Sequence, residues 1–396
     1  MSNRLSGAQH CKWRISRVVA RNPFLSLGLA ILLAACSSDP ELGSPGYVQG
    51  FTGGVVADEP YAALVGRDIL AAGGSAADAA AATFFALGVT KPASVGLMAQ
   101  GYCLDYNAAD LTHRAYVVDS PAGVRTMAAI HARTGRLPWR QVVGPAEALA
   151  RFEHKRSLAF VDDWQAAAPS DPAAQAVYGG SATEVGAPLQ QLDLAGLLGQ
   201  IREHGAGDFY SGRSAQKLWD AAALAGIGIN RDDWRNALPI AIDPEQRALG
   251  DHLLVTVPVA RTSGTADTRR AESRMVVVDR EGSAVACVFS MGRPYGSGRL
   301  VGGVFFPVAG APEGLPALVT NKNTKILLAA IAGGEPAALA ERTVAAAVPL
   351  DGALASMPGG GNAIVCSRGL PNYPESCQAG SDPAGHGLAA LGDPRS

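Results

Sequence analysis

The feature that most constrains the fold of this chain is a pair of apolar runs joined by a short turn. Residues 275–278 are apolar and mostly β-branched, and residues 284–289 form a second apolar run. Between them, Asp279 and Gly282 stand first and last in a tetrapeptide, as a type I turn prefers. Neither run alternates polar with apolar residues, so both strands are expected to be buried on two faces. The pattern predicts a hairpin at the centre of a layered α/β core.

Helix signals follow an early apolar strand at residues 54–57. Pro60 stands at the first position of a predicted helix that ends before Gly73. Ser75 and Asp78 have the spacing of a capping box, which predicts that a second helix begins there. This second helix is almost entirely Ala and then Phe, so it is expected to be packed on all sides.

Charge and histidine placement argue against several classes of function. The formal net charge is -2 with both signs scattered, and no basic block is interleaved with aromatic residues, so no nucleic-acid partner is expected. The seven His residues show no metal-ligand spacing. The sequence predicts neither a metal nor a cofactor.

The N-terminal segment is typical of an export signal. A basic region precedes the apolar residues 24–35, a run too short to span a bilayer comfortably. The run ends in Leu33-Ala34-Ala35-Cys36, which resembles the lipobox of bacterial lipoproteins. We therefore expect a lipoprotein signal peptide over residues 1–35, lipidation of Cys36, and a Ser-, Pro- and Gly-rich tether over residues 36–52.

This interpretation places the protein on the periplasmic side of the cell envelope, held to the membrane by a lipid anchor. Ser37, rather than Asp, after the cysteine favours the outer membrane. Two alternatives stay open: an ordinary signal peptide cleaved near Ala35, or an uncleaved signal anchor.

Four cysteines lie beyond this segment. Cys366 and Cys377 flank a turn region containing two prolines, and an oxidising periplasm would favour a disulfide between them. The alternative is a pair of unpaired, buried thiols. Cys103 and Cys287 lie in apolar surroundings and are expected to be core residues.

Several short motifs keep one order along the chain. Together they resemble the γ-glutamyltransferase family, which belongs to the N-terminal-nucleophile hydrolases. The resemblance implies an α+β fold, a four-layer αββα sandwich, with a shortened helical segment before residue 272. It also implies one domain over residues 53–396, with a large-subunit-like part (53–271) and a small-subunit-like part (272–396). The motifs are the Gln-Gln-Leu-Asp-Leu-Ala run at 190–195, Phe209-Tyr210-Ser211-Gly212, Gly296-Ser297-Gly298 and the closing segment 378–387.

The resemblance breaks down at the residues that carry the family's chemistry. That family cuts its own precursor before a Thr, which becomes both nucleophile and base; the matching position here is Glu272. Ser273 matches a second Thr, and Arg274 matches a His. Ser120 stands where the family has an Arg that clamps the substrate carboxylate. We therefore expect a chain that is not autoprocessed and is catalytically impaired, and whose ligand, if it has one, is a small γ-glutamyl or amino-acid-like molecule.

Two alternatives remain. In the first, the chain is an active γ-glutamyl or amide hydrolase or transferase: Ser273 becomes the N-terminal nucleophile, Ser290 orients it, and the N–H groups of Gly333 and Gly334 form the oxyanion hole. The two glycines could equally form a tight strand-to-helix turn. In the second alternative, the chain is an unrelated binding module whose similarity to the family is accidental.

Overall fold

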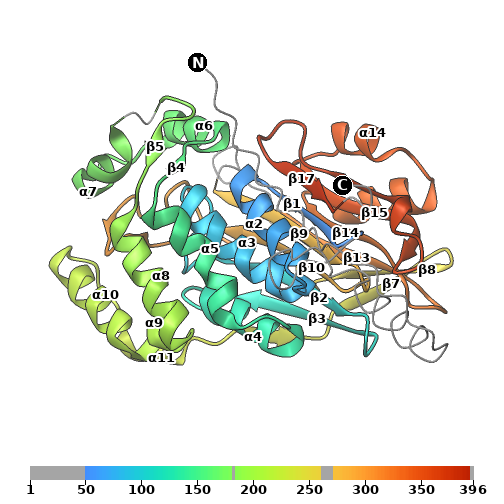
Figure 1. Ribbon diagram of the computed structural model, residues 1–396, viewed down its shortest axis with the longest axis horizontal. Helices are drawn as coiled ribbons and strands as arrows, with labels where there is room; N and C mark the ends of the chain where they lie inside the picture. The colour runs from blue at the N-terminus through green and yellow to red at the C-terminus, as the bar shows by residue number, and fades with distance from the viewer. Residues whose placement is uncertain (1–49, 181–182, 260–270, 393–396) are drawn as a thin grey trace, which may run out of the picture. The chain divides into compact units, whose positions relative to one another are not determined.

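The computed structural model of the 396-residue chain describes residues 50–180, 183–259 and 271–392 (Figure 1). The predicted signal peptide over residues 1–35, the predicted lipidation site Cys36 and most of the tether over residues 36–52 lie outside the described residues. Within the part of the chain that is described, no helix is long and apolar enough to cross a membrane.

Two antiparallel sheets form the centre of the fold. The first has seven strands, in the order β17 (Leu388–Leu391), β1 (Gly53–Ala57), β9 (Glu272–Asp279), β10 (Ala284–Ser290), β2 (Gln100–Asn107), β3 (Thr112–Val118) and β6 (Ile240–Ile242). The second has six, in the order β16 (Cys377–Gly380), β15 (Gly361–Leu370), β14 (Leu327–Gly333), β13 (Leu315–Asn321), β8 (His252–Thr256) and β7 (Glu245–Leu249). Apolar side chains of both sheets meet in one core, among them Val276 and Val278 from the first sheet and Leu318 and Ile364 from the second.

The predicted hairpin is confirmed as the pair β9 and β10 in the interior of the first sheet. Every residue of both strands is buried, as the absence of alternation indicated. The Gly282 N–H donates to the Asp279 carbonyl at 3.1 Å and closes the turn.

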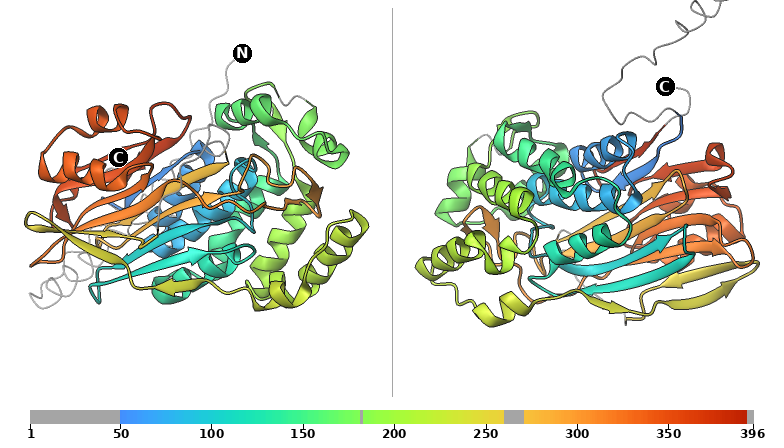
Figure 2. Two further views of the ribbon diagram at one scale, coloured as in Figure 1. Left: turned by 180° about the vertical axis from the view of Figure 1, so that it is seen from behind. Right: turned by 60° about the horizontal axis from the view of Figure 1, so that its bottom comes forward.

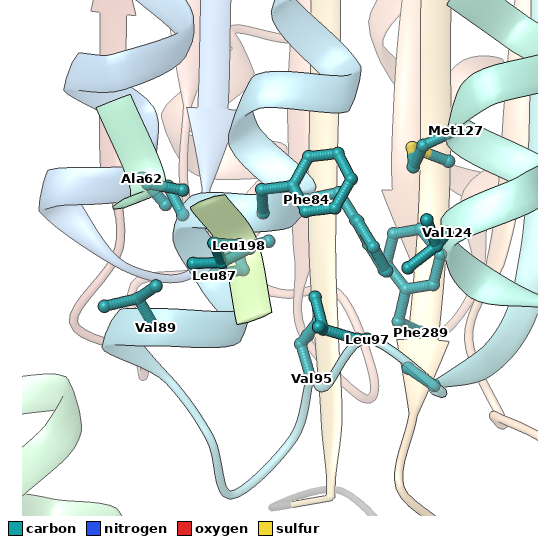
Figure 3. Close-up of a cluster of buried hydrophobic side chains, with 14 of the residues drawn as sticks. Ala62, Phe84, Leu87, Val89, Val95, Leu97, Val124, Met127, Leu198 and Phe289 are labelled. Atoms are coloured by element: carbon teal, nitrogen blue, oxygen red, sulfur yellow. The ribbon is translucent and has the colours of Figure 1, made fainter. Parts of the chain in front are cut away.

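A helical layer covers the outer face of the first sheet. The right-hand view of Figure 2 shows helices over that face, with the second sheet on the other side. The main helices of the layer are α2 (Pro60–Ala71), α3 (Ala76–Thr90), α4 (Gly123–Thr134), α5 (Trp139–Arg151) and α8 (Leu192–His204). Phe84 of α3 packs beside Phe289 of β10, with ring centroids 4.9 Å apart, in a cluster that helices α2, α4 and α8 also enter (Figure 3).

The predicted helix starts are confirmed. Pro60 is the first residue of α2, and the Ser75 and Asp78 side chains form both halves of a capping box at α3. All fifteen residues of α3 are buried, as its composition indicated.

A second helical layer covers the outer face of the second sheet. Leu339, Leu350 and Leu354 pack there against Val319 and Ile331 of the sheet. The layer consists of α13 (Pro336–Ala340), the π-helical turn η2 (Glu341–Ala345) and α14 (Leu350–Ala355). The order helix, sheet, sheet, helix is the predicted αββα sandwich. Residues 260–270 belong to the segment that was predicted to be shortened, and they lie outside the described residues.

Shorter elements extend the helical side of the fold, at the left of Figure 1. The helical ones are α6 (Leu158–Ala167), α7 (Pro172–Ala174), the π-helical turn η1 (Gln175–Gly179), α9 (Asp208–Ser211), α10 (Arg213–Leu224) and α11 (Arg231–Asn236). Two small ribbons join them: β4 (His154–Lys155) with β5 (Pro188–Leu189), and β11 (Leu300–Val301) with β12 (Val304–Phe305). A short 3₁₀ helix, η3 (Pro374–Ser376), links β15 to β16.

Two disulfides tie neighbouring strands together. One joins Cys366 to Cys377 across β15 and β16. The other joins Cys103 to Cys287 across β2 and β10. Cys103 and Cys287 are core residues, as predicted. Their pairing was not predicted, because the two cysteines are 184 residues apart in the sequence and meet only where their strands lie in direct register.

Candidate ligand-binding site

The alternation of side chains along β9 decides which residues face the space between the sheets. Val276 and Val278 pack into the core between the sheets, whereas Met275 and Val277 pack against the helices. Successive side chains of a strand point to opposite faces, so Glu272 and Arg274 lie on the inter-sheet side. Ser273 lies on the helix side.

A cavity of about 670 Å³ opens at the start of β9. Glu272 and Arg274 line it, and Ser273 does not. The other walls come from the entry to α2, the end of α3, helix α6, and the segments that follow α14 and β16. These walls contribute six further polar side chains: Asp58, Lys91, Asp162, Asp163, Asp382 and His386.

Arg274 is held on one wall of this cavity by three interactions. Its Nη1 donates to Asp382 Oδ2 at 3.0 Å, its Nη2 donates to the Gly359 carbonyl at 2.7 Å, and its backbone N–H donates to Asp58 Oδ2 at 2.9 Å. Burial alone would lower the pKa of Arg274, but the carboxylates of Asp58, Asp382 and Glu272 outweigh that effect and raise it. The guanidinium is therefore a permanent cation in the wall.

Asn362 links the residues around Arg274. The side chain is fully buried, and its Nδ2 donates to Asp58 Oδ1 at 2.8 Å and to the Arg274 carbonyl at 3.1 Å. Its Oδ1 accepts the Asp382 N–H at 3.1 Å. One amide thus connects β9, β15, the residue that follows β1 and the segment after β16.

Glu272 is a buried carboxylate bonded to main-chain amides. One oxygen accepts the Glu313 N–H, and the other accepts the Gly314 N–H at 3.3 Å. Burial raises the pKa of Glu272, while these N–H donors and Arg274 act in the opposite direction. The side chain is 5% exposed and reaches the cavity edge.

Lys91 and Asp163 form an ion pair in another part of the cavity wall. Lys91 Nζ lies 2.5 Å from Asp163 Oδ2, and both side chains are almost fully buried. Burial alone would lower the pKa of Lys91, but Asp163, Asp58 and Glu59 together raise it. Lys91 is therefore protonated and is not a candidate amine nucleophile.

Ser273 and Ser290 lie on opposite faces of the first sheet. Ser273 pairs with Phe289, which packs against the helices. The Ser273 Oγ is fully buried and has no hydrogen-bond partner among the described residues. Ser290 pairs with Glu272, and its Oγ accepts the Gly292 N–H at 2.9 Å. In the uncleaved chain, the structure therefore does not bring these two predicted catalytic residues together.

Gly333 is the last residue of β14, and Gly334 follows it; both pack against the backbone of residues 358–361. The Gly334 N–H donates to the Gly360 carbonyl at 3.0 Å, and neither glycine lines the cavity. A Cβ on Gly334 would lie 2.4 Å from the Pro358 carbonyl oxygen, so close backbone packing explains the glycine there.

Charged side chains provide most of the polar groups of the cavity. Among the described residues, none that lines the cavity carries a hydroxyl or a thiol. The described part of the chain also contains no group of three His, Cys, Asp or Glu residues that could hold a metal ion. The walls instead offer fixed carboxylates and cations.

Sequence reasoning missed most of this network. Asp382 lies in the closing segment that carried a family motif, and Lys91 follows the Ala-rich helix, so a search for charged residues inside motifs could have found both. No local signal marks Asn362 or Asp58, because their roles depend on strands brought together from distant parts of the chain.

The family model and the relatives that match this chain point to the same protein family. The sequence model described as gamma-glutamyltranspeptidase matches residues 62–122 and 115–269. The chain is 28% identical over 271 residues to glutathione hydrolase 5 proenzyme of Rattus norvegicus, covering 59% of this chain and 47% of that protein. It is 30% identical over 234 residues to glutathione hydrolase proenzyme of Pseudomonas aeruginosa, covering 49% of this chain and 40% of that protein. The chain thus spans about half the length of the curated relatives it matches.

A solved structure shares the fold over nearly the whole chain. Cephalosporin acylase from Bacillus halodurans superposes with a TM-score of 0.68 and covers 89% of this chain and 98% of the acylase chain. The sequence identity is 15%, so this likeness concerns the fold alone.

Proposed function

Because the chain belongs to the gamma-glutamyltranspeptidase family, we propose that it stays a single uncleaved chain and binds a small γ-glutamyl or amino-acid-like ligand without turning it over. The observation that carries this proposal is the lining of the cavity, which has no hydroxyl or thiol among the described residues. The family that this chain belongs to attacks its substrate with a Thr hydroxyl, and no described residue of the lining supplies one. Glu272 stands at the cavity edge, where the family resemblance places the attacking residue.

The environment of Glu272 supports the proposal that self-cleavage is lost. Its two carboxylate oxygens accept the N–H groups of Glu313 and Gly314, so they are already engaged. The side chain offers no hydroxyl that could attack the preceding carbonyl. Since the α-amine base of the family appears only after cleavage, the same substitution removes nucleophile and base together.

Two of the relatives are named glutathione hydrolase proenzymes, so glutathione and glutamate are the first ligands to test. The cavity volume of about 670 Å³ lies within the range of small-molecule sites. The charged walls match a molecule that carries both amine and carboxylate groups.

We also propose that the protein acts at the periplasmic side of the envelope, anchored through lipid on Cys36. The basic region, the apolar run and the small residues before that cysteine support this location. A Cys36→Ala variant is expected to leave the membrane fraction. Retention of this variant in membranes would argue for a signal anchor instead.

The proposal of binding without turnover is tested on one preparation. A chromogenic γ-glutamyl anilide and glutathione are incubated with the mature protein, and glutamate release is followed. In parallel, calorimetry measures the binding of glutathione, glutamate and other amino acids. We expect saturable binding of at least one of these compounds and no turnover above background. Sustained glutamate release, or no binding of any compound, would overturn the proposal.

A further inference from the structure

One continuous segment forms a large part of the cavity wall. Residues 382–386 all line the cavity, and they lie between β16, which ends at Gly380, and β17, which begins at Leu388. β16 pairs with β15 in the second sheet, whereas β17 pairs with β1 in the first. The connection over residues 381–387 therefore crosses from one sheet to the other along the cavity. We call residues 381–387 the strap.

Asp382 fastens the strap to the rest of the wall. Its Oδ2 accepts from Arg274 Nη1 at 3.0 Å, and its N–H donates to Asn362 Oδ1 at 3.1 Å. The residues that follow turn back on Asp382 itself. The Ala384 N–H donates to Asp382 Oδ1 at 2.9 Å, and the Gly385 N–H donates to the Asp382 carbonyl at 3.0 Å. The position of the strap thus depends on Asp382 and on the two strands at its ends.

The Cys366–Cys377 disulfide fixes the strand from which the strap leaves. β16 is an edge strand of four residues, and each of the four is at least partly exposed. A short, exposed edge strand is expected to open at a low cost in free energy. The disulfide joins the first residue of β16 to β15. β16 therefore docks onto β15 without the entropy cost of closing the loop between the two cysteines.

The two disulfides of the chain differ in their access to solvent. Cys103 and Cys287 are both fully buried, on strands in the interior of the first sheet. Cys377, in contrast, is partly exposed on the edge strand β16. Thiol–disulfide exchange needs access for the attacking thiolate. A small dithiol is therefore expected to reduce Cys366–Cys377 while the Cys103–Cys287 bond of the folded chain stays intact.

From these observations we propose that the Cys366–Cys377 disulfide controls the closure of the cavity. One sulfur of a small dithiol attacks the Cys377 sulfur, the S–S bond breaks, and Cys366 leaves as a thiolate. The second sulfur of the dithiol then displaces Cys377, so the dithiol becomes a disulfide and its two protons pass to the two cysteines. β16 and the strap then separate from β15 and Arg274, and the wall opens. This inference rests on the proposed function, since it concerns the regulation of the same cavity.

The chain-entropy relation for disulfides gives the size of the effect. Cys366 and Cys377 are 11 residues apart in the sequence. For a loop of that length, the relation corresponds to a factor of about 100 in the equilibrium between docked and released β16. Native-state amide exchange reports such local opening. We therefore expect the amides of β16 and of Asp382 to exchange about 10–100-fold faster after reduction.

Hydrogen–deuterium exchange on the full mature chain tests the proposal without any substitution. The chain is measured before and after treatment with dithiothreitol and alkylation, and peptide mapping identifies the alkylated cysteines. We expect alkyl groups on Cys366 and Cys377 but not on Cys103 or Cys287, and faster exchange over residues 377–387. Peptides from β9 and β10 are the internal control and should exchange as before.

Three results of this experiment would overturn the proposal. The first is resistance of Cys366–Cys377 to the dithiol in the folded chain. The second is reduction of this bond without faster exchange over residues 377–387. The third is faster exchange throughout the chain, β9 and β10 included, because that would show a general loss of stability rather than release of the strap.

A pair of double variants gives the same comparison without a reductant. Cys366→Ala with Cys377→Ala should reproduce the faster exchange of the strap. Cys103→Ala with Cys287→Ala removes the other disulfide and is the matched control, in which exchange of the strap should stay as in the native chain. A folded Cys366→Ala/Cys377→Ala variant with native exchange over the strap would contradict the proposal. The measurement on the native chain stands even if the control variant fails to fold.

Calorimetry with L-glutamate, which carries no thiol, connects the strap to binding. We expect the affinity to fall about tenfold or more in the reduced and alkylated chain, because the residues of the strap leave the wall. Equal affinity in the two forms would overturn control of the cavity by the disulfide. Failure of glutamate to bind the oxidised chain would count against the proposed ligand class instead, and the exchange measurement would still decide whether the strap is released.

Discussion

Ser273 lies directly opposite Phe289 in the β9–β10 ladder, on the face of the first sheet that packs against the helices. Its neighbours Glu272 and Arg274 point the other way and line the cavity. A shift of one residue along a strand moves a side chain to the opposite face. For Ser273 to act as a nucleophile in this cavity, the start of β9 would therefore have to change register or leave the sheet. This relationship favours the binding interpretation over the hydrolase alternative.

Asn362 is expected to be a stability determinant of the site. Asn362→Ala removes three hydrogen bonds inside the core and leaves buried polar groups without partners. The expected loss in the free energy of unfolding is about 2–4 kcal/mol, measured by denaturant titration. Asn323→Ala, in an exposed turn, is the control and should stay within about 0.5 kcal/mol of the native chain. Similar losses in both variants would contradict the role assigned to Asn362.

The Lys91–Asp163 pair is expected to behave as a buried ion pair. Lys91→Met leaves the Asp163 carboxylate buried without its partner and should lower stability by about 3–5 kcal/mol. Adding Asp163→Leu should recover part of that loss, because the unpaired charge is gone. The exposed pair Arg368 and Glu375 is the comparison, and Glu375→Gln should change stability by less than about 1 kcal/mol. A double variant no more stable than Lys91→Met would refute this account.

Much of the fold could be predicted because its signals are local. The β9–β10 hairpin follows from two apolar runs around an Asp–Gly turn, and the start of α3 follows from Ser75 and Asp78. The disulfide between Cys103 and Cys287 could not be predicted in this way, since it depends on β2 lying beside β10. The cavity is even harder to predict from the sequence, because Asp58, Asn362 and Asp382 meet only when three strands from both sheets are in place.

Asp279 is expected to make stability depend on pH. Burial raises the pKa of this carboxyl to about 6, above the unfolded value of about 3.9. The folded chain therefore holds the proton more tightly, so this contribution to stability is complete below about pH 4 and is lost as the pH rises through about 6.

The Asp279→Asn variant tests this sign. Between about pH 4 and about pH 7, the free energy of unfolding should fall in both proteins. The fall should be smaller in the variant than in the native chain, by about 1–3 kcal/mol. The change with pH is the readout, because the variant also replaces one of the two acceptor oxygens by an amide NH₂. The Ala76 N–H, which donates to Oδ2, then loses its acceptor, while the remaining oxygen can still accept from Glu281 and Ser283. Asp243→Asn, at an exposed position, should follow the native curve. An Asp279→Asn curve parallel to the native one would show that Asp279 does not titrate in this range.

The two disulfides should differ in their contributions to stability. They span 184 and 11 residues, and closing the longer loop removes more entropy from the unfolded chain. The chain-entropy estimate is about 5 kcal/mol for Cys103–Cys287 and about 3 kcal/mol for Cys366–Cys377. Denaturant unfolding of the two double Cys→Ala variants compares them directly. A larger loss from removing Cys366 and Cys377 would contradict the expected order.

Intact-mass spectrometry of the purified mature protein, together with a denaturing gel, tests the central claim most directly. With Glu272 in place of an attacking hydroxyl, we predict one continuous polypeptide and no break on either side of residue 272. The account would be contradicted by two tightly associated fragments, of which the second begins at Ser273, in a preparation that releases glutamate from glutathione.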